Sequence, residues 1–326
     1  MAGRIVGTGH FLPDQVLDNA ALASTIGRDD QWILQRTGIR ERRIAPPDAG
    51  TAALAVAAAL SALEDAGRTS ADADVIIVAT STPDYLTPPT ACEVQAALGA
   101  SGAAAFDIEA GFAGWIYALL VADALIAAGT VRTALVIGAE KLSTVTDRSD
   151  EATAPLFGDG AGAIVLAAGD NGWGVGARSW WADGRLADAL RRPGGGAREP
   201  FDRTVLDERR HLLRMEGTRL FRQAVRTMAA QARAVLEGVG LGVDAIDLII
   251  PHQANLRILH AFAEELAIPL DRVFVNIERY GNTGSATVPI ALDEALRSGA
   301  ADEASRILLV SFGAGATAGA VLLERG

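Results

Sequence analysis

Apolar runs and amphipathic segments alternate along the chain. The apolar runs are rich in Val, Ile and Leu, and several stop at a turn-forming residue; they lie at 75–80, 133–138, 162–166, 248–250, 307–312 and 318–323. Runs that are apolar on both faces predict strands buried between layers of helices. Helices are predicted at 51–66, 91–98, 112–128, 217–238 and 287–298. The alternation places the chain in the α/β class.

Segment 112–128 differs from the other predicted helices, because Asp123 is its only charged residue. A helix that is apolar all round is buried on all sides. One architecture that needs such a helix places it between two sheets.

Each half of the chain contains a strand pair with a glycine turn. The two sequences are FGDGAGAIVL at 157–166 and SFGAGATAGAVLL at 311–323, and their similarity indicates an internal duplication. We therefore predict an N-terminal half at 1–170 and a C-terminal half at 171–326. Residues 168–200 are rich in Gly, Asp, Arg and Trp, and predict an irregular connection.

The charge pattern narrows the possible functions. The 326 residues carry a net charge of −11 with a pI of about 4.9, and no run of Lys and Arg offers a track for phosphates. Nucleic acid is therefore not expected as the main partner. Lys141 is the single lysine, so a Schiff-base mechanism would depend on it.

Cysteine content and hydropathy exclude further classes. Cys92 is alone, so no intrachain disulfide or cysteine metal cluster can form, and the histidine spacing does not match HExxH. No metal site is predicted. The N-terminal segment lacks the apolar stretch of a signal peptide, and 112–128 is shorter than a membrane span of about 20 residues. We expect a soluble, cytoplasmic protein with no membrane partner.

A turn of small residues at 109–114, EAGFAG, lies between a predicted strand and a predicted helix. Such a turn commonly presents a nucleophile, because the helix dipole lowers the pKa of a thiol there. The residue presented here is Phe112, which has no nucleophilic atom. Covalent catalysis by a nucleophile at this position is therefore excluded.

Other segments carry candidate chemistry, each with a structural alternative. His252 follows a buried strand in IIPHQANLRI. This is a position where α/β proteins bind ligands, and the alternative is an ordinary polar loop. Asn282, in RYGNTGSATVPIAL, is either an amide donor in a site or part of a helix cap. The GAGA turn at 313–316 fits a nest of backbone N–H groups and equally a hairpin. Trp32 and Arg36 share a helix face that can bind a ring and a phosphate, or lie at the surface.

The motifs QWILQRTGIRER, FGDGAGAIVL, PHQANLRI and GNTGSATVPIALDEAL occur in the order and at roughly the spacing seen in β-ketoacyl-ACP synthase III. From Ile5 to Leu323 the chain resembles this family of thiolase-like condensing enzymes. The resemblance implies a five-layer αβαβα fold of two related halves, usually a homodimer. It also implies an acyltransferase of fatty acid or polyketide-type synthesis that joins acyl-CoA and malonyl-ACP. Coenzyme A and acyl carrier protein then carry the substrates, and no further cofactor is expected.

The resemblance also assigns roles to residues. His252 and Asn282 correspond to the pair that donates hydrogen bonds to the thioester oxygen of malonyl-ACP and stabilises the enolate formed as carbon dioxide leaves. Ala314 lies in the glycine turn that contributes a backbone N–H to the oxyanion hole. Thr87 stands where some members place a Phe that shortens the acyl pocket, and Glu151 where an Arg often contacts the adenine end of coenzyme A. The residues expected to line the coenzyme A tunnel are Trp32, Arg36, Gly217, Phe221, Asn255 and Arg257.

The main departure from the family pattern is Phe112, at the position of the cysteine that accepts the acyl group. Cys92 lies in a different predicted helix and cannot replace it. We predict a synthase III-like acyl-thioester enzyme, and three interpretations of Phe112 stay open. In the first, the chain is a condensing enzyme whose nucleophile was replaced by engineering or a single-base change. In the second, it is a malonyl-thioester decarboxylase or a non-covalent acyltransferase that uses His252 and Asn282. In the third, it is a non-catalytic partner subunit or a module that binds acyl groups or coenzyme A. Glu109, near the turn, is either a replacement base or nucleophile or compensates the helix dipole.

Overall fold

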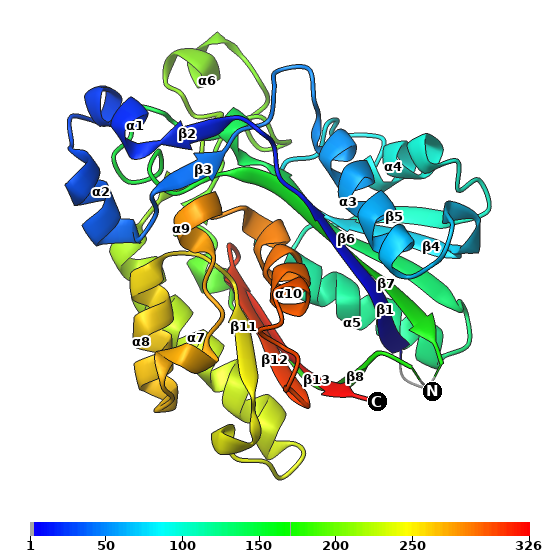
Figure 1. The fold of residues 1–326 in the computed structure, drawn as a ribbon. Coiled ribbons are helices and arrows are strands. Elements are labelled where there is room, and N and C mark those ends of the chain that lie inside the picture. Colours follow the sequence, from blue (N-terminus) through cyan, green and yellow to red (C-terminus); the bar gives the residue numbers. More distant parts are fainter. Residues whose placement is uncertain (1–2, 170) are drawn as a thin grey trace.

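Nine of the described strands form one continuous sheet in the order β11-β12-β13-β8-β1-β7-β6-β4-β5 (Figure 1). The computed structural model describes residues 3–169 and 171–326. The strands of this sheet are β1 (Gly3–Phe11), β4 (Val75–Ala79), β5 (Ala104–Ile108), β6 (Thr133–Lys141), β7 (Asp159–Ala168), β8 (Trp173–Ala182), β11 (Leu248–Pro251), β12 (Arg306–Gly313) and β13 (Thr317–Arg325). Two small sheets pair β2 (Val16–Asp18) with β3 (Glu41–Arg43) and β9 (Leu190–Arg191) with β10 (Arg214–Met215).

The helices lie on both faces of the sheet and around one end of it. They are α1 (Asn19–Ile26), α2 (Asp30–Thr37), α3 (Thr51–Asp65), α4 (Thr90–Leu98), α5 (Gly114–Ala127), α6 (Arg203–Asp207), α7 (Gly217–Glu237), α8 (Leu256–Leu266), α9 (Ile277–Tyr280) and α10 (Thr287–Arg297). The five predicted helices correspond to α3, α4, α5, α7 and α10, with ends that differ by at most two residues. Among the described residues, no helix is long and apolar enough to cross a membrane.

The sheet is folded so that its two halves face each other across α5 and α10. Among the described strands, the two halves of the sheet pair where Arg4 and Ile5 of β1 lie opposite Gly174 and Trp173 of β8. Helices α3 and α4 cover the outer face of one half, and α7 and α8 cover the outer face of the other (Figure 1). The layers are therefore α, β, α, β, α, which confirms the predicted architecture.

Strand β4 shows why strands of this sheet are apolar on both faces. Ile77 faces the central layer with α5, whereas Ile76 and Val78 face α3 and α4. All three side chains are fully buried. A strand covered on both sides gains from apolar residues at every position, because each buried side chain contributes roughly 1.5–3 kcal/mol.

Helix α5 is buried between the two halves of the sheet, as its sequence predicts. Its one charged residue, Asp123, has no exposed surface. The Asp123 carboxylate accepts a hydrogen bond from the Gly3 backbone nitrogen at 2.6 Å and forms an ion pair with Arg178 of β8. The buried charge is thus paired, as a charge in an apolar layer must be.

The same order of strand pairings occurs in both halves. Strand β1 pairs antiparallel with β7, β7 antiparallel with β6, and β6 parallel with β4. Strand β8 likewise pairs antiparallel with β13, β13 antiparallel with β12, and β12 parallel with β11. The division into 1–170 and 171–326 stays a prediction, and residue 170 lies outside the described residues.

The prediction of an irregular connection over 168–200 is wrong for its first part, because β8 occupies Trp173–Ala182 and joins the two halves of the sheet, whereas 183–200 contains only short elements. Trp173 and Val175 are buried there, whereas Arg178 and Trp180 are exposed. The strand therefore has no apolar run, and its glycines and charged residue resemble a loop. Strand β1 and helix α8 were also not predicted.

Candidate active site

The turn at 109–114 connects β5 to α5 and packs backbone against backbone on the turn between β12 and β13. A Cβ atom on Gly313 would overlap the backbone nitrogen of Phe112, and one on Gly111 would lie 2.6 Å from the nitrogen of Ala314. Gly111 also has a φ of +53°, which residues with a side chain rarely adopt. The two glycines therefore bring segments from opposite halves into contact, whichever side chain occupies position 112.

The phenyl ring of Phe112 is buried, with 6% of the residue exposed. Its centroid lies 5.9 Å from that of Phe157, edge to face, and 5.6 Å from that of His252. The Phe112 carbonyl accepts a hydrogen bond from the Ser311 hydroxyl at 2.9 Å. The ring thus fills the space beside His252 with a surface that has no nucleophilic atom.

His252 is held at the carboxyl end of β11 by two contacts. Its backbone nitrogen donates to the Val310 carbonyl at 2.8 Å, and its Nδ1 lies 2.5 Å from the hydroxyl of Thr287. Burial lowers the pKa of the imidazole to about 3. The ring is therefore neutral at physiological pH, and a hydroxyl that donates to Nδ1 leaves the hydrogen on Nε2.

Asn282 is equally fixed. Its backbone nitrogen donates to the Leu156 carbonyl at 2.8 Å, and its carbonyl accepts from Gly158 at 3.1 Å. The side-chain Oδ1 accepts from the backbone nitrogen of Gly284 at 2.9 Å. That contact orients the amide and leaves Nδ2 as the donor available to a ligand.

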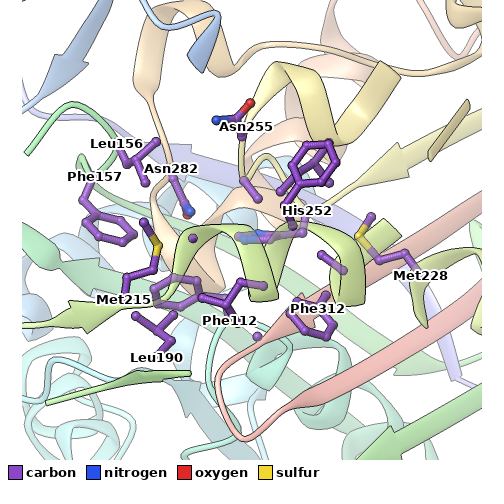
Figure 2. Close-up of a pocket in the computed structure, with 17 residues that line it drawn as sticks. Phe112, Leu156, Phe157, Leu190, Met215, Met228, His252, Asn255, Asn282 and Phe312 are labelled. Carbon is purple, nitrogen blue, oxygen red and sulfur yellow. The ribbon is translucent and has the colours of Figure 1, made fainter. Parts of the chain in front are cut away.

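An apolar cavity brings Phe112, His252 and Asn282 together (Figure 2). His252 and Asn282 supply side-chain nitrogens to a wall that is otherwise almost entirely apolar. The other lining residues are Leu156, Phe157, Leu190, Met215, Gly217, Leu220, Phe221, Ala224, Met228, Ala254, Asn255, Ile258, Phe312 and Gly313. In such surroundings a hydrogen bond to developing negative charge is stronger than in water.

A second, outer cavity continues from the inner one toward the surface. The two cavities share part of their walls, formed by Leu156, Met215, Gly217, Phe221 and Asn255. The outer cavity is also lined by Trp32, Arg36 and Arg257. All six residues predicted to line a coenzyme A tunnel therefore lie along one passage that ends at His252 and Asn282.

The wall of the outer cavity carries one carboxylate among several guanidinium groups. Glu151 pairs with Arg28 at 2.7 Å, and both side chains are about half exposed. The guanidinium groups of Arg28 and Arg36 lie over the Trp32 ring at 5.1 and 4.8 Å from its centroid. Arg257 lies over another aromatic ring of the passage, 5.8 Å from its centroid. The outer passage is thus basic overall, with Glu151 as its local exception.

Comparison with known proteins decides the family. Models of 3-oxoacyl-[acyl-carrier-protein (ACP)] synthase III match residues 106–184, and models of its C-terminal region match residues 236–325. The chain is 46% identical over 317 residues to the β-ketoacyl-[acyl-carrier-protein] synthase III of Caldanaerobacter subterraneus subsp. tengcongensis, covering 97% of this chain and 96% of that protein. The chain belongs to the β-ketoacyl-ACP synthase III family. This is a family of acyl-condensing transferases.

Solved structures of synthase III enzymes have the same fold. The enzyme from Aquifex aeolicus VF5 superposes with a TM-score of 0.91 at 44% identity, over 99% of both chains. The priming β-ketosynthase from the R1128 polyketide biosynthetic pathway superposes with a TM-score of 0.91 at 36% identity, over 99% of this chain and 96% of that one. The thiolase-like fold predicted from the resemblance is confirmed.

Three residues singled out in the sequence lie away from the cavities of this synthase III family member. Thr87 is exposed on the loop between β4 and α4 and does not line the pocket within one chain, because that loop turns outward with its neighbour Leu86 83% exposed. Glu109 is also exposed and accepts hydrogen bonds from the Ser81 hydroxyl at 2.9 Å and the Gly111 nitrogen at 3.1 Å. Cys92 lies on α4 and lines neither cavity.

The contact with the Gly111 nitrogen favours backbone compensation as the role of Glu109, because the carboxylate satisfies an N–H group of the turn. Ala314 packs against this turn but does not line the inner cavity, whose wall includes its neighbour Gly313. Among the described residues, no group of three or more His, Cys, Asp or Glu side chains could hold a metal ion.

Most of the inner wall was not predicted from the sequence. Phe157 and Phe312 belong to the two glycine-turn motifs, so their neighbourhood could have been suspected. The remaining apolar residues of α7 and α8 face the cavity on the same helix faces that pack into the core. Their pattern is that of ordinary amphipathic helices and carries no separate signal.

Proposed function

We propose that this chain decarboxylates malonyl thioesters in the passage that ends at His252 and Asn282, without forming an acyl-enzyme. The observation that carries the proposal is that these two neutral donors line one apolar cavity beside a residue with no nucleophilic atom. Relatives named β-ketoacyl-ACP synthase III support an acyl-thioester substrate, and the passage lined by Trp32, Arg36 and Arg257 supports its entry toward His252 and Asn282. Condensation through an acyl-enzyme also needs a nucleophile, which Phe112 does not provide.

The proposed step balances without a nucleophile. The bond between the malonyl carboxyl carbon and the α-carbon breaks, carbon dioxide leaves, and the electron pair forms a thioester enolate. His252 Nε2–H and Asn282 Nδ2–H donate to the enolate oxygen, where negative charge concentrates in the transition state. Water then protonates the α-carbon, and the product is an acetyl thioester.

The experiment compares carbon dioxide release and acetyl-thioester formation by four purified proteins: the unchanged chain, His252→Ala, Asn282→Ala and Phe112→Ala. Malonyl-CoA and malonyl-ACP are the substrates. Loss of one preorganised donor costs about 3 kcal/mol, so His252→Ala and Asn282→Ala should each slow turnover roughly a hundredfold or more. Phe112→Ala should lose much less, since the ring donates nothing to the enolate.

Identical purification of the four proteins controls for a condensing enzyme carried over from the expression host, which would give all four the same rate. A chain that binds coenzyme A or carrier protein but shows no turnover above buffer would rule out the decarboxylase. The non-catalytic partner would then be the better interpretation.

We further propose that the malonyl group arrives on acyl carrier protein, that the protein acts as a homodimer, and that it works in the cytoplasm. Support for a dimer comes from β5, the edge strand of the sheet, and from the exposed apolar side chains of Tyr85 and Leu86 on the neighbouring loop. Unpaired edge strands and exposed apolar loops are features that partners cover. Sedimentation analysis of the purified chain tests the dimer directly.

A further inference from the structure

Glu140, near the end of β6, is a carboxylate with no exposed surface. It accepts hydrogen bonds from the hydroxyls of Thr82 at 2.6 Å and Ser285 at 2.9 Å. Weaker contacts come from the Ser81 nitrogen at 3.1 Å, the Thr80 hydroxyl at 3.4 Å and the Ser285 nitrogen at 3.4 Å. None of these donors is a cation. Glu140 lines neither cavity, so the proposed reaction does not use it directly.

The segment 282–287, which Glu140 holds through Ser285, orients both hydrogen-bond donors of the active site. At its start, Asn282 Oδ1 accepts from the Gly284 nitrogen. At its end, the Thr287 hydroxyl lies against His252 Nδ1. Ser285 stands between these two contacts. Its backbone nitrogen and its hydroxyl both contact the Glu140 carboxylate, and the hydroxyl also lies 2.8 Å from the Ala79 carbonyl.

Packing at Gly284 shows how closely the carboxylate and the active site are connected. A Cβ atom on Gly284 would lie 2.8 Å from Glu140 Cγ and 3.1 Å from Phe112 Cδ1. The segment therefore passes between Glu140 and the ring in the cavity with no room to spare. In close-packed surroundings a change at Glu140 is expected to displace this segment, and Asn282 with it.

We propose that Glu140 is a positioning residue, whose carboxylate holds segment 282–287 so that Asn282 Nδ2 and His252 Nε2 converge on the thioester oxygen. The inference rests on the proposed function where it is tested by decarboxylation rates. Where it is tested by the position of Asn282 in crystal structures, it rests on the structure alone. Glutamine is the informative replacement, since its amide keeps the shape of the side chain and one acceptor oxygen but replaces the other oxygen with an NH2 group, which cannot accept from a backbone nitrogen. Aspartate keeps the acceptors and shortens the reach.

The two charged side chains nearest Glu140 along the chain and beyond Ser81 make their hydrogen bonds elsewhere. Glu109 accepts a hydrogen bond from the hydroxyl of Ser81, whose backbone nitrogen contacts Glu140. Lys141 points away and donates to the carbonyls of Pro46 at 2.9 Å and Ala49 at 2.6 Å. Segment 282–287 contributes no charged side chain.

Burial raises the pKa of Glu140 to about 7, against hydrogen bonds from Thr82 and Ser285 that lower it. A protonated carboxyl accepts fewer hydrogen bonds, and the Ser285 hydroxyl, which lies 2.8 Å from the Ala79 carbonyl, can then donate to that carbonyl instead of to Glu140. Protonation therefore changes the contacts that hold segment 282–287. Turnover should therefore rise as pH increases through about 7. The His252 imidazole, with a pKa of about 3, stays neutral over that range and cannot cause the rise.

The kinetic test measures kcat and KM for malonyl-CoA decarboxylation from pH 5.5 to 8.5, with Glu140→Gln, Glu140→Asp and Ser285→Ala, and with exposed Glu303→Gln as the matched control. Misplacement of a catalytic group by about 1 Å costs up to about a hundredfold, so we expect kcat of Glu140→Gln to fall roughly ten- to a hundredfold with little change in KM. The rise through pH 7 should disappear in Glu140→Gln. Glu140→Asp should recover part of the rate and keep a rise, and Glu303→Gln should match the unchanged chain.

A Glu140→Gln protein with unchanged kcat and an unchanged pH profile would overturn the inference. Should Glu140→Gln fail to fold, Ser285→Ala is the second test. It removes the hydroxyl contacts to Glu140 and to the Ala79 carbonyl and leaves the backbone contact to Glu140. It should lower kcat severalfold and change the pH profile, and an unchanged rate would overturn the inference.

The geometric test needs no turnover. Crystal structures of the unchanged chain and of Glu140→Gln should differ in the position of the Asn282 amide, and an unmoved segment 282–287 would contradict the inference. If the unchanged chain has no activity but the segment moves in Glu140→Gln, the proposed function fails and the positioning role of Glu140 stands.

Discussion

At the scale of single residues, the active site depends on the nitrogen donors of His252 and Asn282 and on the absence of a nucleophilic atom in Phe112. The backbone on either side of Phe112 is held by Gly111, Gly313 and the Ser311 hydroxyl, none of which contacts a group specific to phenylalanine. The position at the start of α5 is therefore intact as a backbone site. A thiol placed there would stand where the helix dipole favours a thiolate.

Phe112→Cys should accordingly form an acyl-enzyme. Incubation with acetyl-CoA followed by intact mass measurement should show one acetyl adduct on the variant and none on the unchanged chain. The replacement also empties part of a packed cavity, so the free energy of unfolding should fall by about 3 kcal/mol.

In the Phe112→Cys protein the second thiol is Cys92, so a variant without Cys92 shows which thiol carries the adduct. The adduct should persist in a protein that carries both Phe112→Cys and Cys92→Ser. A folded Phe112→Cys protein that binds coenzyme A but takes up no acetyl group would show that the cavity no longer presents a thioester to this turn.

At the scale of elements, α2 brings an aromatic ring and a cation to the outer passage. Asp29 caps its start by accepting from the Trp32 nitrogen at 2.7 Å, and Gly38 ends it with a φ of +76°. A Cβ atom on Gly38 would overlap the side chain of Leu256, the first residue of α8. The end of α2 therefore packs closely on α8, and this sets where Trp32 and Arg36 stand.

Glu151→Gln should strengthen binding of coenzyme A, because it removes a negative charge from the passage that would receive the nucleotide phosphates. Exposed charge pairs contribute up to about 1 kcal/mol, so the dissociation constant should fall roughly two- to fivefold at low salt. Calorimetric titration measures it. Pantetheine, which has no nucleotide, is the control ligand and should bind both proteins alike; equal gains for the two ligands would refute the electrostatic explanation.

At the scale of the whole molecule, two buried groups give the stability opposite dependences on pH. The folded chain keeps His252 unprotonated down to about pH 3, whereas the unfolded chain protonates it near 6.5. Its contribution to stability is therefore lost as pH falls below about 6.5. The folded chain holds a proton on Glu140 up to about pH 7, whereas the unfolded chain releases it above about 4.5. The Glu140 contribution therefore grows as pH falls from 7 toward 4.5.

His252→Gln should therefore make the protein less sensitive to acid. Between pH 6.5 and 5, the unchanged chain should lose free energy of unfolding relative to the variant by up to about 1.4 kcal/mol per pH unit. Chemical denaturation at a series of pH values measures both proteins. Parallel pH profiles would show that His252 does not titrate differently in the folded and unfolded chains.

The sequence alone determined the class of the fold and most of its core. Strand β4 and the central part of β6 are buried on both faces, and strands in that position are apolar at nearly every residue, so that the sequence alone predicts them. Helix α5 could be predicted for the same reason, because its burial on all sides leaves it no polar face. The strand β8 was missed because its exposed positions carry Arg178 and Trp180, so that its pattern resembles a loop.

The sequence also placed the candidate chemistry at His252, Asn282 and the turn of Phe112, through motifs long enough to indicate a family. Only the tertiary structure decided which residues meet. Phe112 contacts residues from the other half of the chain, Thr87 stays outside the pocket within one chain, and Glu140 reaches Ser285 from 145 positions away. Local patterns record burial and turn geometry, whereas contacts between distant segments follow from how layers pack, and that packing is set by the whole chain at once.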